Sequence, residues 1–565
     1  MNNGQNSRLQ AAAGHFQAGR LAEARDLCAE ILADNPQNVM ALHLHGILHC
    51  QGGQMAKGAE LIAGAVRLDP KNPIIHYDLG KAWFAQGRLE DAVAAFGQAL
   101  DLKPDFAEVH SNLGNVLGIM GRPDDALAAY DRALELNPNF AEAHNNRGNT
   151  LKDQGRLPDA AAAYERALAI NPKYPEAHYN RGNLHSSRGE LEAALAAYEA
   201  ALALRPAYDE ALNNLGSAFQ NLGRFGEARA AFDRLLRLRH GGPWWNAASF
   251  DAGAGTGAGA GNGGGGGGGK ALNASAFKLA DAIDQIDYLI SRGRLDGSFE
   301  AMAERYRSVL VELDSSPATE LSAAQSARIG AFHDRVFHYN PAPRIAGRAI
   351  NRDLDFRGIE AEYLSSAVSV ISLDDFLTPE ALASLRDFCL ESTIFFDYTG
   401  ERFVSSRSNQ GFNCDLLYQM AEELASSLPG VLGGHALKNM WVYRYNNQSE
   451  GVAEHTDDGA VTFNFWITPD DANLNPGGGG LVVYAKEQPL DWDWERYNRE
   501  KYGADMKREI DEFLSDAETI TIPYGENRAV LFCSNLYHKS DRVNFKDGFE
   551  NRRMNITMLF GQRGG

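Results

Sequence analysis

The same residue types return at a fixed interval through the first 240 residues of this 565-residue chain. Proline, glycine, alanine and an aromatic residue each recur every 34 residues and keep a constant register with one another. The prolines are Pro36, Pro70, Pro104, Pro138, Pro172 and Pro206, and the glycines are Gly46, Gly80, Gly114, Gly148, Gly182 and Gly216. The alanines are Ala92, Ala126, Ala160, Ala194 and Ala228, and the aromatic residues are Phe96, Tyr130, Tyr164, Tyr198 and Phe232. This register predicts a stack of similar units, not one irregular core.

Each unit is expected to consist of two antiparallel helices, with glycine and alanine where the helices approach closely and the aromatic residue filling the gap to the next unit. Proline is expected to end one unit and start the next, because it is tolerated in the first turn of a helix. The period and these positions resemble the tetratricopeptide repeat. That resemblance implies an all-α superhelix of about six to seven units over residues 1–240, with a concave groove.

Asparagine occupies one repeat position in four units, at Asn112, Asn146, Asn180 and Asn214. A second row follows three residues later, at Asn115, Asn149 and Asn183, and this spacing places both rows on one helix face. Amide side chains both donate to and accept from an extended peptide backbone. The first row resembles the asparagine ladder of the O-GlcNAc transferase repeat superhelix, which implies a protein or peptide partner in the groove. The alternative is that asparagine at these positions serves repeat packing.

The repeats are followed by a segment of different composition. Residues 241–271 consist largely of glycine and alanine and are predicted to form a flexible linker, since such a segment cannot offset its ordering entropy by burial. Gly264 to Lys270 superficially suggests a phosphate-binding loop, but Ala271 stands where that motif needs serine or threonine. Residues 272–366 place apolar residues near helical spacing and are predicted to form a helical bridge.

The charge balance and the cysteines narrow the class of protein. The chain has 54 basic and 74 acidic residues, a formal net charge of -20, which weighs against a dedicated nucleic-acid-binding protein. No apolar run is long enough to span a bilayer, and the N-terminus lacks the pattern of a secretion signal, so we expect a cytoplasmic protein. The five cysteines have no disulfide or zinc spacing and are expected to be reduced thiols: Cys28, Cys50, Cys389, Cys414 and Cys533.

Short β-strands dominate the last part of the chain, residues 367–565. The predicted strands are the runs LKNMWVYRY, VTFNFWIT, GLVVYA, TITIP, RAVLFCS and MNITMLFG. Glycine and asparagine turns separate them, which indicates a sandwich or barrel. The run TPEALASLRDFCLES is predicted to be a helix with Thr378 as its N-cap. A charged insert at 486–524 interrupts the strands and is interpreted as a solvated lid.

Two histidines and one aspartate in these strands form a candidate metal site. His455 and Asp457 are two residues apart in a strand-like region, so their side chains are expected to project to the same face. His538 follows the strand Arg528–Cys533 and is the predicted third ligand. Two imidazoles and one carboxylate on one face leave further coordination positions open, as non-haem Fe(II) requires when it also binds a bidentate substrate and O₂.

The final strand places an arginine on a predicted interior face. Arg553, Asn555 and Thr557 share one face by the period of two, while Met554, Ile556 and Met558 share the other. An arginine that points into an apolar interior needs an anionic partner, and a dicarboxylate held by two hydrogen bonds would supply one. Arg542 and Arg552 are alternative candidates, and a surface salt bridge is the structural alternative for Arg553.

These motifs together resemble the 2-oxoglutarate/Fe(II) oxygenase superfamily, which has a double-stranded β-helix (jelly-roll) fold with flanking helices. The resemblance covers about residues 367–562, and the string from Arg553 to Thr557 is similar to AlkB-type members. It implies that His455, Asp457 and His538 bind Fe(II), and that Arg553 binds 2-oxoglutarate with Tyr445, Tyr443 and Asn555 nearby. O₂ would be the second substrate.

The expected function is therefore a 2-oxoglutarate-dependent dioxygenase that hydroxylates a protein or peptide recruited by the repeats. One alternative is a repeat scaffold for protein–protein interaction whose oxygenase-like part is not catalytic. A small-molecule or nucleic-acid oxygenase is another alternative.

Overall fold

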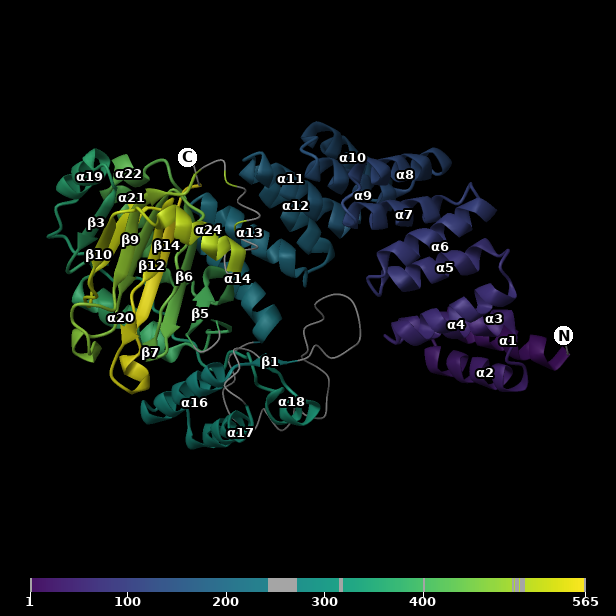
Figure 1. Ribbon diagram of the computed structural model, residues 1–565, viewed down its shortest axis with the longest axis horizontal. Helices are drawn as coiled ribbons and strands as arrows, with labels where there is room; N and C mark the ends of the chain where they lie inside the picture. Colours follow the sequence, from purple (N-terminus) through teal and green to yellow (C-terminus); the bar gives the residue numbers. More distant parts are fainter. Residues whose placement is uncertain are drawn as a thin grey trace. The chain divides into compact units, whose positions relative to one another are not determined.

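The chain divides between Tyr208 and Asp209 into two units that each make most of their contacts internally. The computed structural model describes residues 3–241, 272–313, 319–399, 402–489 and 504–562, together with Trp492 and Tyr497 (Figure 1). The predicted linker, residues 241–271, lies outside the described residues apart from Gly241. The boundary between the units falls one helix pair before the predicted end of the repeat array at residue 240.

The first unit consists of six antiparallel helix pairs. Their bounds are α1 Asn3–Gln17, α2 Leu21–Asp34, α3 Val39–Gln51, α4 Met55–Leu68, α5 Pro73–Phe84, α6 Leu89–Leu102, α7 Ala107–Ile119, α8 Pro123–Leu136, α9 Ala141–Asp153, α10 Leu157–Ile170, α11 Pro175–Ser187 and α12 Leu191–Leu204. A seventh pair with the same sequence pattern, α13 Asp209–Asn221 and α14 Phe225–His240, belongs to the second unit. The all-α repeat organisation predicted from the 34-residue period is confirmed.

The recurring glycine and aromatic residue contact each other within each pair. A Cβ atom built on Gly148 would lie 2.6 Å from the Tyr164 ring, and the same close approach recurs between Gly182 and Tyr198. In the second pair Ile62 takes the place of the aromatic residue, and it lies against Gly46. The recurring alanines are buried at the same interfaces. The period therefore records one packing contact that is repeated along the chain.

The recurring prolines do not start helices, contrary to the expectation for them. Pro70, for example, lies in the loop between α4 and α5, and α5 begins at Pro73. Its carbonyl oxygen lies 2.9 Å from Nε2 of His76, a contact that Pro104, Pro138 and Pro172 repeat with the following histidines. Proline is suited to this position because it cannot extend the preceding helix.

The last helix pair packs against the β-rich part of the second unit. The amide of Gln220 donates to the carbonyl oxygens of Leu437 and Lys438, at 3.3 and 2.8 Å. The Phe225 ring stacks on the Tyr418 ring with centroids 4.9 Å apart. These contacts make residues 209–240 part of the C-terminal unit, although their sequence continues the repeat.

Helices, two larger antiparallel sheets and two two-stranded pairs form the rest of this unit. The helices are α16 Ala276–Ser291, η1 Gly297–Phe299, α17 Glu300–Leu310, α18 Ala323–Ile329, α19 Phe356–Ser365, α20 Pro379–Glu391, η2 Ser408–Gln410, α21 Asp415–Ser427, α22 Pro429–Leu432, η3 Asp470–Ala472, α24 Ala504–Leu514 and η4 Phe549–Asn551. The predicted cap is present, because the Thr378 hydroxyl accepts from the amide of Ala381.

The larger sheet has seven strands in the order β3-β11-β8-β14-β6-β5-β4, and a smaller sheet has the order β10-β9-β12. Strands β13 and β7 pair separately, as do β1 and β2. The bounds are β1 Asn273–Ala274, β2 Thr319–Glu320, β3 Val370–Leu373, β4 Asp397–Thr399, β5 Phe403–Arg407, β6 Leu437–Tyr445, β7 Gln448–Ser449, β8 Val461–Trp466, β9 Leu481–Glu487, β10 Thr519–Ile522, β11 Ala529–Cys533, β12 Leu536–Ser540, β13 Val543–Asn544 and β14 Met554–Phe560. The β-rich character predicted for this part is confirmed.

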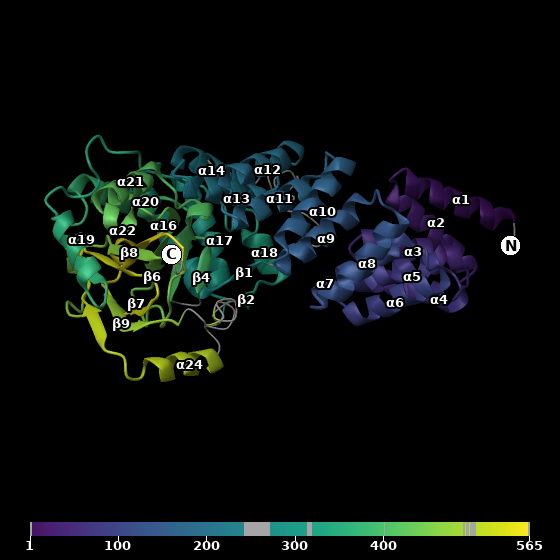
Figure 2. The ribbon, with the colours of Figure 1, turned by 90° about the horizontal axis from the view of Figure 1, so that it is seen from above.

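The two faces of the larger sheet have different surroundings. Helices α20, α21 and α22 cover one face, and β7 and β9 lie on the other side (Figure 2). Met554, Ile556 and Met558 pack in the helix-covered core. Trp466 and Tyr445 pack instead with Leu481 and Val483 of the smaller sheet. The predicted alternation along the final strand is thus present, and the polar residues of β14 face the interior between the sheets.

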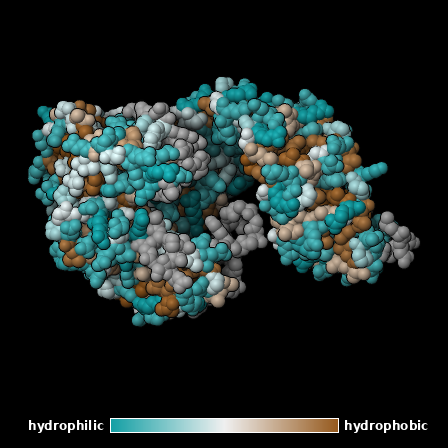
Figure 3. Space-filling model, in the orientation of Figure 1, coloured by the Kyte–Doolittle hydropathy of each residue, from teal (hydrophilic) through white to brown (hydrophobic). Residues whose placement is uncertain are grey.

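None of the described helices is both long enough and apolar enough to cross a membrane. All five cysteines are free thiols in the structure. Apolar patches are visible on the surface of the repeat array in Figure 3, where Met40 and Ile74 are 65% and 53% exposed.

Candidate metal centre

Backbone pairing brings the two ligand-bearing segments together. The amide of His455 donates to the carbonyl oxygen of His538 at 3.0 Å, and the reverse hydrogen bond is 2.9 Å. The amide of Asp457 donates to the carbonyl oxygen of Ser534 at 3.1 Å. His455 therefore lies in an isolated bridge between β7 and β8, and not in a regular strand as the sequence suggested. His538 lies within β12, a strand that the sequence analysis did not identify.

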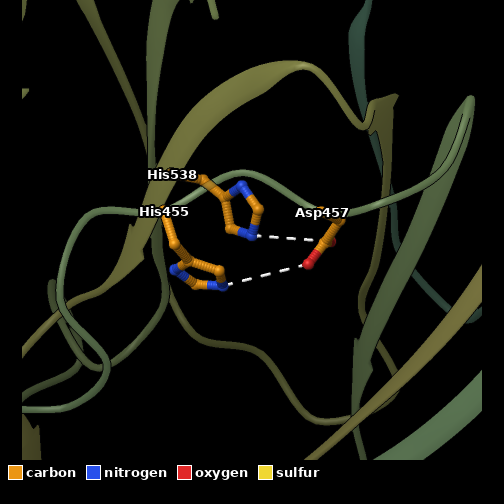
Figure 4. Close-up of side chains that lie close together, drawn as sticks. All are labelled: His455, Asp457 and His538. Atoms are coloured by element: carbon orange, nitrogen blue, oxygen red, sulfur yellow. Dashed lines mark ion pairs between the residues drawn. The ribbon is translucent and has the colours of Figure 1, made fainter. Parts of the chain in front are cut away.

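The three side chains converge on one small space (Figure 4). Nε2 of His455 lies 3.9 Å from Oδ1 of Asp457, and Nε2 of His538 lies 3.6 Å from Oδ2. One ligand atom from each residue lies within 4.8 Å of the others. Within the described part of the chain, this is the one group of three or more histidine, cysteine or acidic side chains with such geometry. The predicted convergence is therefore present, while the role of these residues as metal ligands stays a prediction.

Hydrogen bonds on the far side of each imidazole set its orientation. Nδ1 of His455 lies 2.8 Å from the carbonyl oxygen of Ala453, and Nδ1 of His538 lies 3.1 Å from that of Leu536. A carbonyl oxygen only accepts, so Nδ1 carries the hydrogen in each ring. Both Nε2 atoms are then left with a lone pair directed at the shared space, which is the arrangement found for metal-binding histidines.

Asp457 is held by its neighbours in a similar way. The Thr462 hydroxyl donates to Oδ2 of Asp457 at 2.9 Å, and the same hydroxyl lies 2.8 Å from Oγ of Ser534. The side chains of His538 and Asp457 are 4% and 7% exposed, and that of His455 is 15% exposed. Two nitrogens and one carboxylate suit Fe(II) of the type that keeps open coordination positions.

The three candidate arginines have different environments. Arg542 is on the surface, 3.6 Å from Glu450, with three quarters of its side chain exposed. Arg552 is buried and pairs with Asp281 and Asp284 of α16. Arg553 is fully buried, and its Nε and Nη1 have no hydrogen-bond partner among the residues that the structure describes. Nε of Arg552 also lacks a partner, but Arg552 is paired with two carboxylates, whereas Arg553 is paired with none among the described residues.

Aromatic residues surround the Arg553 guanidinium. Its central carbon lies 4.6 Å from the Tyr445 ring centroid and 5.7 Å from that of Trp466. Nη2 donates to the carbonyl oxygen of Gly480 at 3.1 Å. Burial raises the pKa of the nearby Tyr524 phenol, and the Arg553 charge partly opposes that rise. The guanidinium thus lies in an aromatic and largely apolar surrounding.

The other predicted co-substrate residues lie on the same interior face. The Tyr445 hydroxyl is 3.0 Å from Oγ of Ser540, and the Tyr443 ring lies edge-on to the Tyr445 ring at 6.1 Å. Asn555 pairs in register with Tyr443 on one side and Trp466 on the other. Ser540 was missed, although it stands two residues after His538 and the strand period places both on one face.

Several buried polar atoms on this face have no hydrogen-bond partner within the described ranges. They are Nε and Nη1 of Arg553, Nε1 of Trp466, Oδ1 of Asn464 and Oδ1 of Asn555. Leaving such atoms buried and unpaired costs about 1–3 kcal/mol each, so hydrogen bonds from a polar ligand at this face would be stabilising. The mixture of donors and acceptors matches a carboxylate-bearing ligand that also carries water or hydroxyl groups.

The asparagine rows of the repeats have two different roles. Asn115, Asn149 and Asn183 accept hydrogen bonds from the tyrosine hydroxyls of the same pairs, so this row serves packing. The first row is partly exposed, and its amides donate to neighbouring pairs: Asn112 to Tyr77, Asn146 to Asn115, and Asn180 to Asn145. Each of these amides has a second N–H and a carbonyl oxygen. Asn214 lies on α13 in the second unit and accepts from Asn213.

Comparison with known proteins identifies the repeats. Family models described as the tetratricopeptide repeat match residues 111–175, 163–196 and 209–239, and one described as the TPR repeat matches 80–121 and 182–223. The chain therefore contains tetratricopeptide repeats. No curated protein sequence matches it.

Solved structures similar to the chain include other repeat proteins. MamA is 25% identical over 29% of this chain and 95% of its own, with a TM-score of 0.27. YrrB, described as a TPR protein with an unusual peptide-binding site, is 23% identical over 33% of this chain and 95% of its own, with a TM-score of 0.27. PilF of Pseudomonas aeruginosa is 19% identical over 36% of this chain and 92% of its own, with a TM-score of 0.33.

Proposed function

We propose that the C-terminal unit is an Fe(II)- and 2-oxoglutarate-dependent dioxygenase with a double-stranded β-helix fold, and that the repeats recruit a protein or peptide substrate. The convergence of His455, Asp457 and His538 on one space carries this proposal. The partnerless donors of buried Arg553, on the same interior face, support 2-oxoglutarate as the co-substrate.

The residues of this interior fit a dicarboxylate. A buried guanidinium without an anion is unfavourable, because its charge has been removed from water without compensation. Nε and Nη1 of Arg553 are both partnerless, and either of them together with an N–H of Nη2 presents the paired-donor edge that a carboxylate accepts. The Tyr445 ring lies beside the guanidinium. Ferrous iron with 2-oxoglutarate and O₂ supplies oxidative decarboxylation, which yields succinate and CO₂ and hydroxylates a C–H bond.

The chain's own residues position these groups and exclude water. The carbonyl oxygens of Ala453 and Leu536 accept from Nδ1 of each histidine, so Nε2 is the nitrogen that would bind the metal. Asp457 supplies the negative charge, and Thr462 fixes one of its oxygens. The apolar residues that pack between the two sheets keep bulk water from the guanidinium and strengthen its attraction for a carboxylate.

The second candidate function is a repeat scaffold without catalysis. Tetratricopeptide repeats are protein-interaction scaffolds, and the family matches support this function more directly than they support an oxygenase. The convergence of His455, Asp457 and His538 favours an enzyme whose repeats also act as a scaffold. A nucleic acid or a small molecule is the alternative substrate class for an oxygenase. The net charge of -20 disfavours a nucleic acid.

Replacing Arg553 by methionine is expected to raise the Michaelis constant for 2-oxoglutarate by about 100-fold, because a charge-assisted bidentate contact contributes about 1.5–3 kcal/mol or more. Succinate formation with Fe(II), with 2-oxoglutarate varied, measures this constant. Arg542→Met removes an exposed arginine from the same unit and should leave the constant unchanged. The same Michaelis constant in both variants would show that Arg553 does not bind 2-oxoglutarate. If the wild type forms no iron-dependent succinate, the scaffold without catalysis is favoured.

Replacing Asn112, Asn146 and Asn180 together by alanine is expected to weaken peptide binding by about 10-fold or more, since each hydrogen bond contributes about 0.5–1.5 kcal/mol. Peptides selected on an array by the wild-type chain can be measured by fluorescence polarisation. Asn139→Ala, in an exposed loop, serves as the control. If the triple variant keeps its helical circular dichroism and its affinity, the first asparagine row is a packing feature and not a binding site.

A further inference from the structure

The insert at 486–524 contacts the segment that carries two of the three predicted ligands. The amide of Thr456, between His455 and Asp457, donates to the Tyr497 hydroxyl at 3.0 Å. The Thr456 hydroxyl donates to Oε1 of Gln488 at 2.6 Å. The insert was interpreted from sequence as a solvated lid, yet Tyr497 and Gln488 are almost completely buried.

The backbone amides of residues 455–457 point alternately to opposite sides, and the middle amide needs a partner from the insert. The amides of His455 and Asp457 are satisfied by the carbonyl oxygens of His538 and Ser534 on one side. The intervening amide of Thr456 faces the other way, and Thr456 is 2% exposed. A buried N–H group without a partner costs about 1–3 kcal/mol, so the Tyr497 hydroxyl stabilises the conformation that aims both ligands inward.

The insert also covers the strand that carries the third ligand. Tyr537, which precedes His538, is fully buried in a cluster with Tyr497, Met506, Ile510 and Leu514. The Tyr497 and Tyr537 rings meet edge-on with centroids 6.4 Å apart. Gln488 in turn donates its backbone amide to the carbonyl oxygen of Asn535 at 2.9 Å. One group of residues therefore contacts both ligand-bearing segments from outside.

We propose that Tyr497 and Gln488 are positioning residues of the metal centre, which hold Thr456 so that His455 and Asp457 reach one metal ion together with His538. This inference rests on the proposed metal site and adds a role for the insert. Groups that orient metal ligands from behind typically contribute 10–100-fold to metal affinity. The effect is expected on metal binding itself, before any substrate is present.

The test is calorimetric titration of the full metal-free chain with Co(II) alone. Tyr497→Phe removes the acceptor for the Thr456 amide, and Thr456→Val removes the hydroxyl that donates to Gln488. Each is expected to raise the Co(II) dissociation constant by about 10-fold. Thr456→Ser keeps the hydroxyl and should restore wild-type affinity.

Lys486→Met separates this specific role from general packing of the insert. Lys486 anchors the same insert through the carbonyl oxygen of Phe513 and the carboxylate of Asp516, at 2.6 and 2.7 Å, away from Thr456. It should lower the unfolding temperature of the metal-free chain slightly, as loss of a partly exposed ion pair does, and leave the Co(II) constant within about twofold. The positioning role would be wrong if Tyr497→Phe and Thr456→Val bound Co(II) as tightly as the wild type, or if Lys486→Met lost as much Co(II) affinity as they do. The proposed metal centre would still stand in either case. Absence of Co(II) binding by the wild type would overturn the metal centre and the inference with it.

Discussion

Replacing Asp457 by alanine is expected to reduce iron-dependent succinate formation to below about one hundredth of the wild-type rate. Residues that only orient a metal ligand contribute 10–100-fold to affinity, so loss of the ligand itself should cost more. Asp457 is also the one carboxylate of the group, and its charge is what the two neutral imidazoles cannot replace. Succinate released with Fe(II), 2-oxoglutarate and O₂ is the quantity to measure.

The adjacent residue offers a matched control for this substitution. Asp458 is exposed, and its carboxylate pairs with Lys438 at 2.9 Å on the surface. Asp458→Ala should keep activity within about twofold, since exposed pairs contribute little. The Asp457 variant should still fold, because the Thr462 hydroxyl keeps its contact with Ser534. A wild-type rate in Asp457→Ala would show that this carboxylate is not a ligand.

The repeat architecture was predictable from sequence because its contacts are local and recur. Gly148 meets Tyr164 within one helix pair, and the same contact returns 34 residues later. Such a contact leaves a period that can be seen without any structure. The period gave no sign that the last pair joins the C-terminal unit, because this depends on contacts such as that between Gln220 and Leu437, which are 217 residues apart.

The candidate site was predictable in residue type but only partly in placement. The spacing of His455 and Asp457, together with the later His538, identified the three candidate side chains, because only a few residue types bind metal ions. The strand β12 was missed, since the short run LYHKS has little apolar character to reveal it. Its register is fixed by pairing with β9 and by the bridge to His455, neither of which is encoded locally.

Which of the three arginines is available to bind 2-oxoglutarate depends on contacts that are distant in sequence. Arg552 and Arg553 are neighbours in the same basic string, and alternation alone assigns them to opposite faces without saying what each face holds. The deciding fact is that Asp281, 271 residues earlier, pairs with Arg552. The helical region that was predicted to form only a bridge therefore supplies the carboxylates that pair with Arg552, whereas no carboxylate of the described residues pairs with Arg553.

Replacing Asp281 by asparagine is expected to lower the free energy of unfolding of the C-terminal unit by about 3–5 kcal/mol, the usual cost of breaking a buried ion pair. Its carboxylate accepts from Nε of Arg444 at 2.9 Å and also pairs with Arg552. Arg444 is fully buried and Arg552 is 6% exposed, so the substitution leaves buried positive charge without full compensation. Hydrogen exchange of peptides from β6 and β14 reports on this unit separately from the repeats.

The same helix provides the control, and pH provides a second test. Asp287 of α16 pairs with Arg307 on the surface, and Asp287→Asn should cost less than about 1 kcal/mol.

Burial alone raises the pKa of Asp281, but the charges of Arg444 and Arg552 outweigh it and hold the pKa below the ordinary value of 3.8. A carboxylate with a lowered folded-state pKa stabilises the fold above its unfolded-state pKa, and this contribution is lost as pH falls through the folded-state value. The difference between wild type and Asp281→Asn should therefore be constant near neutral pH and shrink below pH 3.8. A loss no greater than that of Asp287→Asn would mean that this buried cluster does not hold the helical region to the sheet.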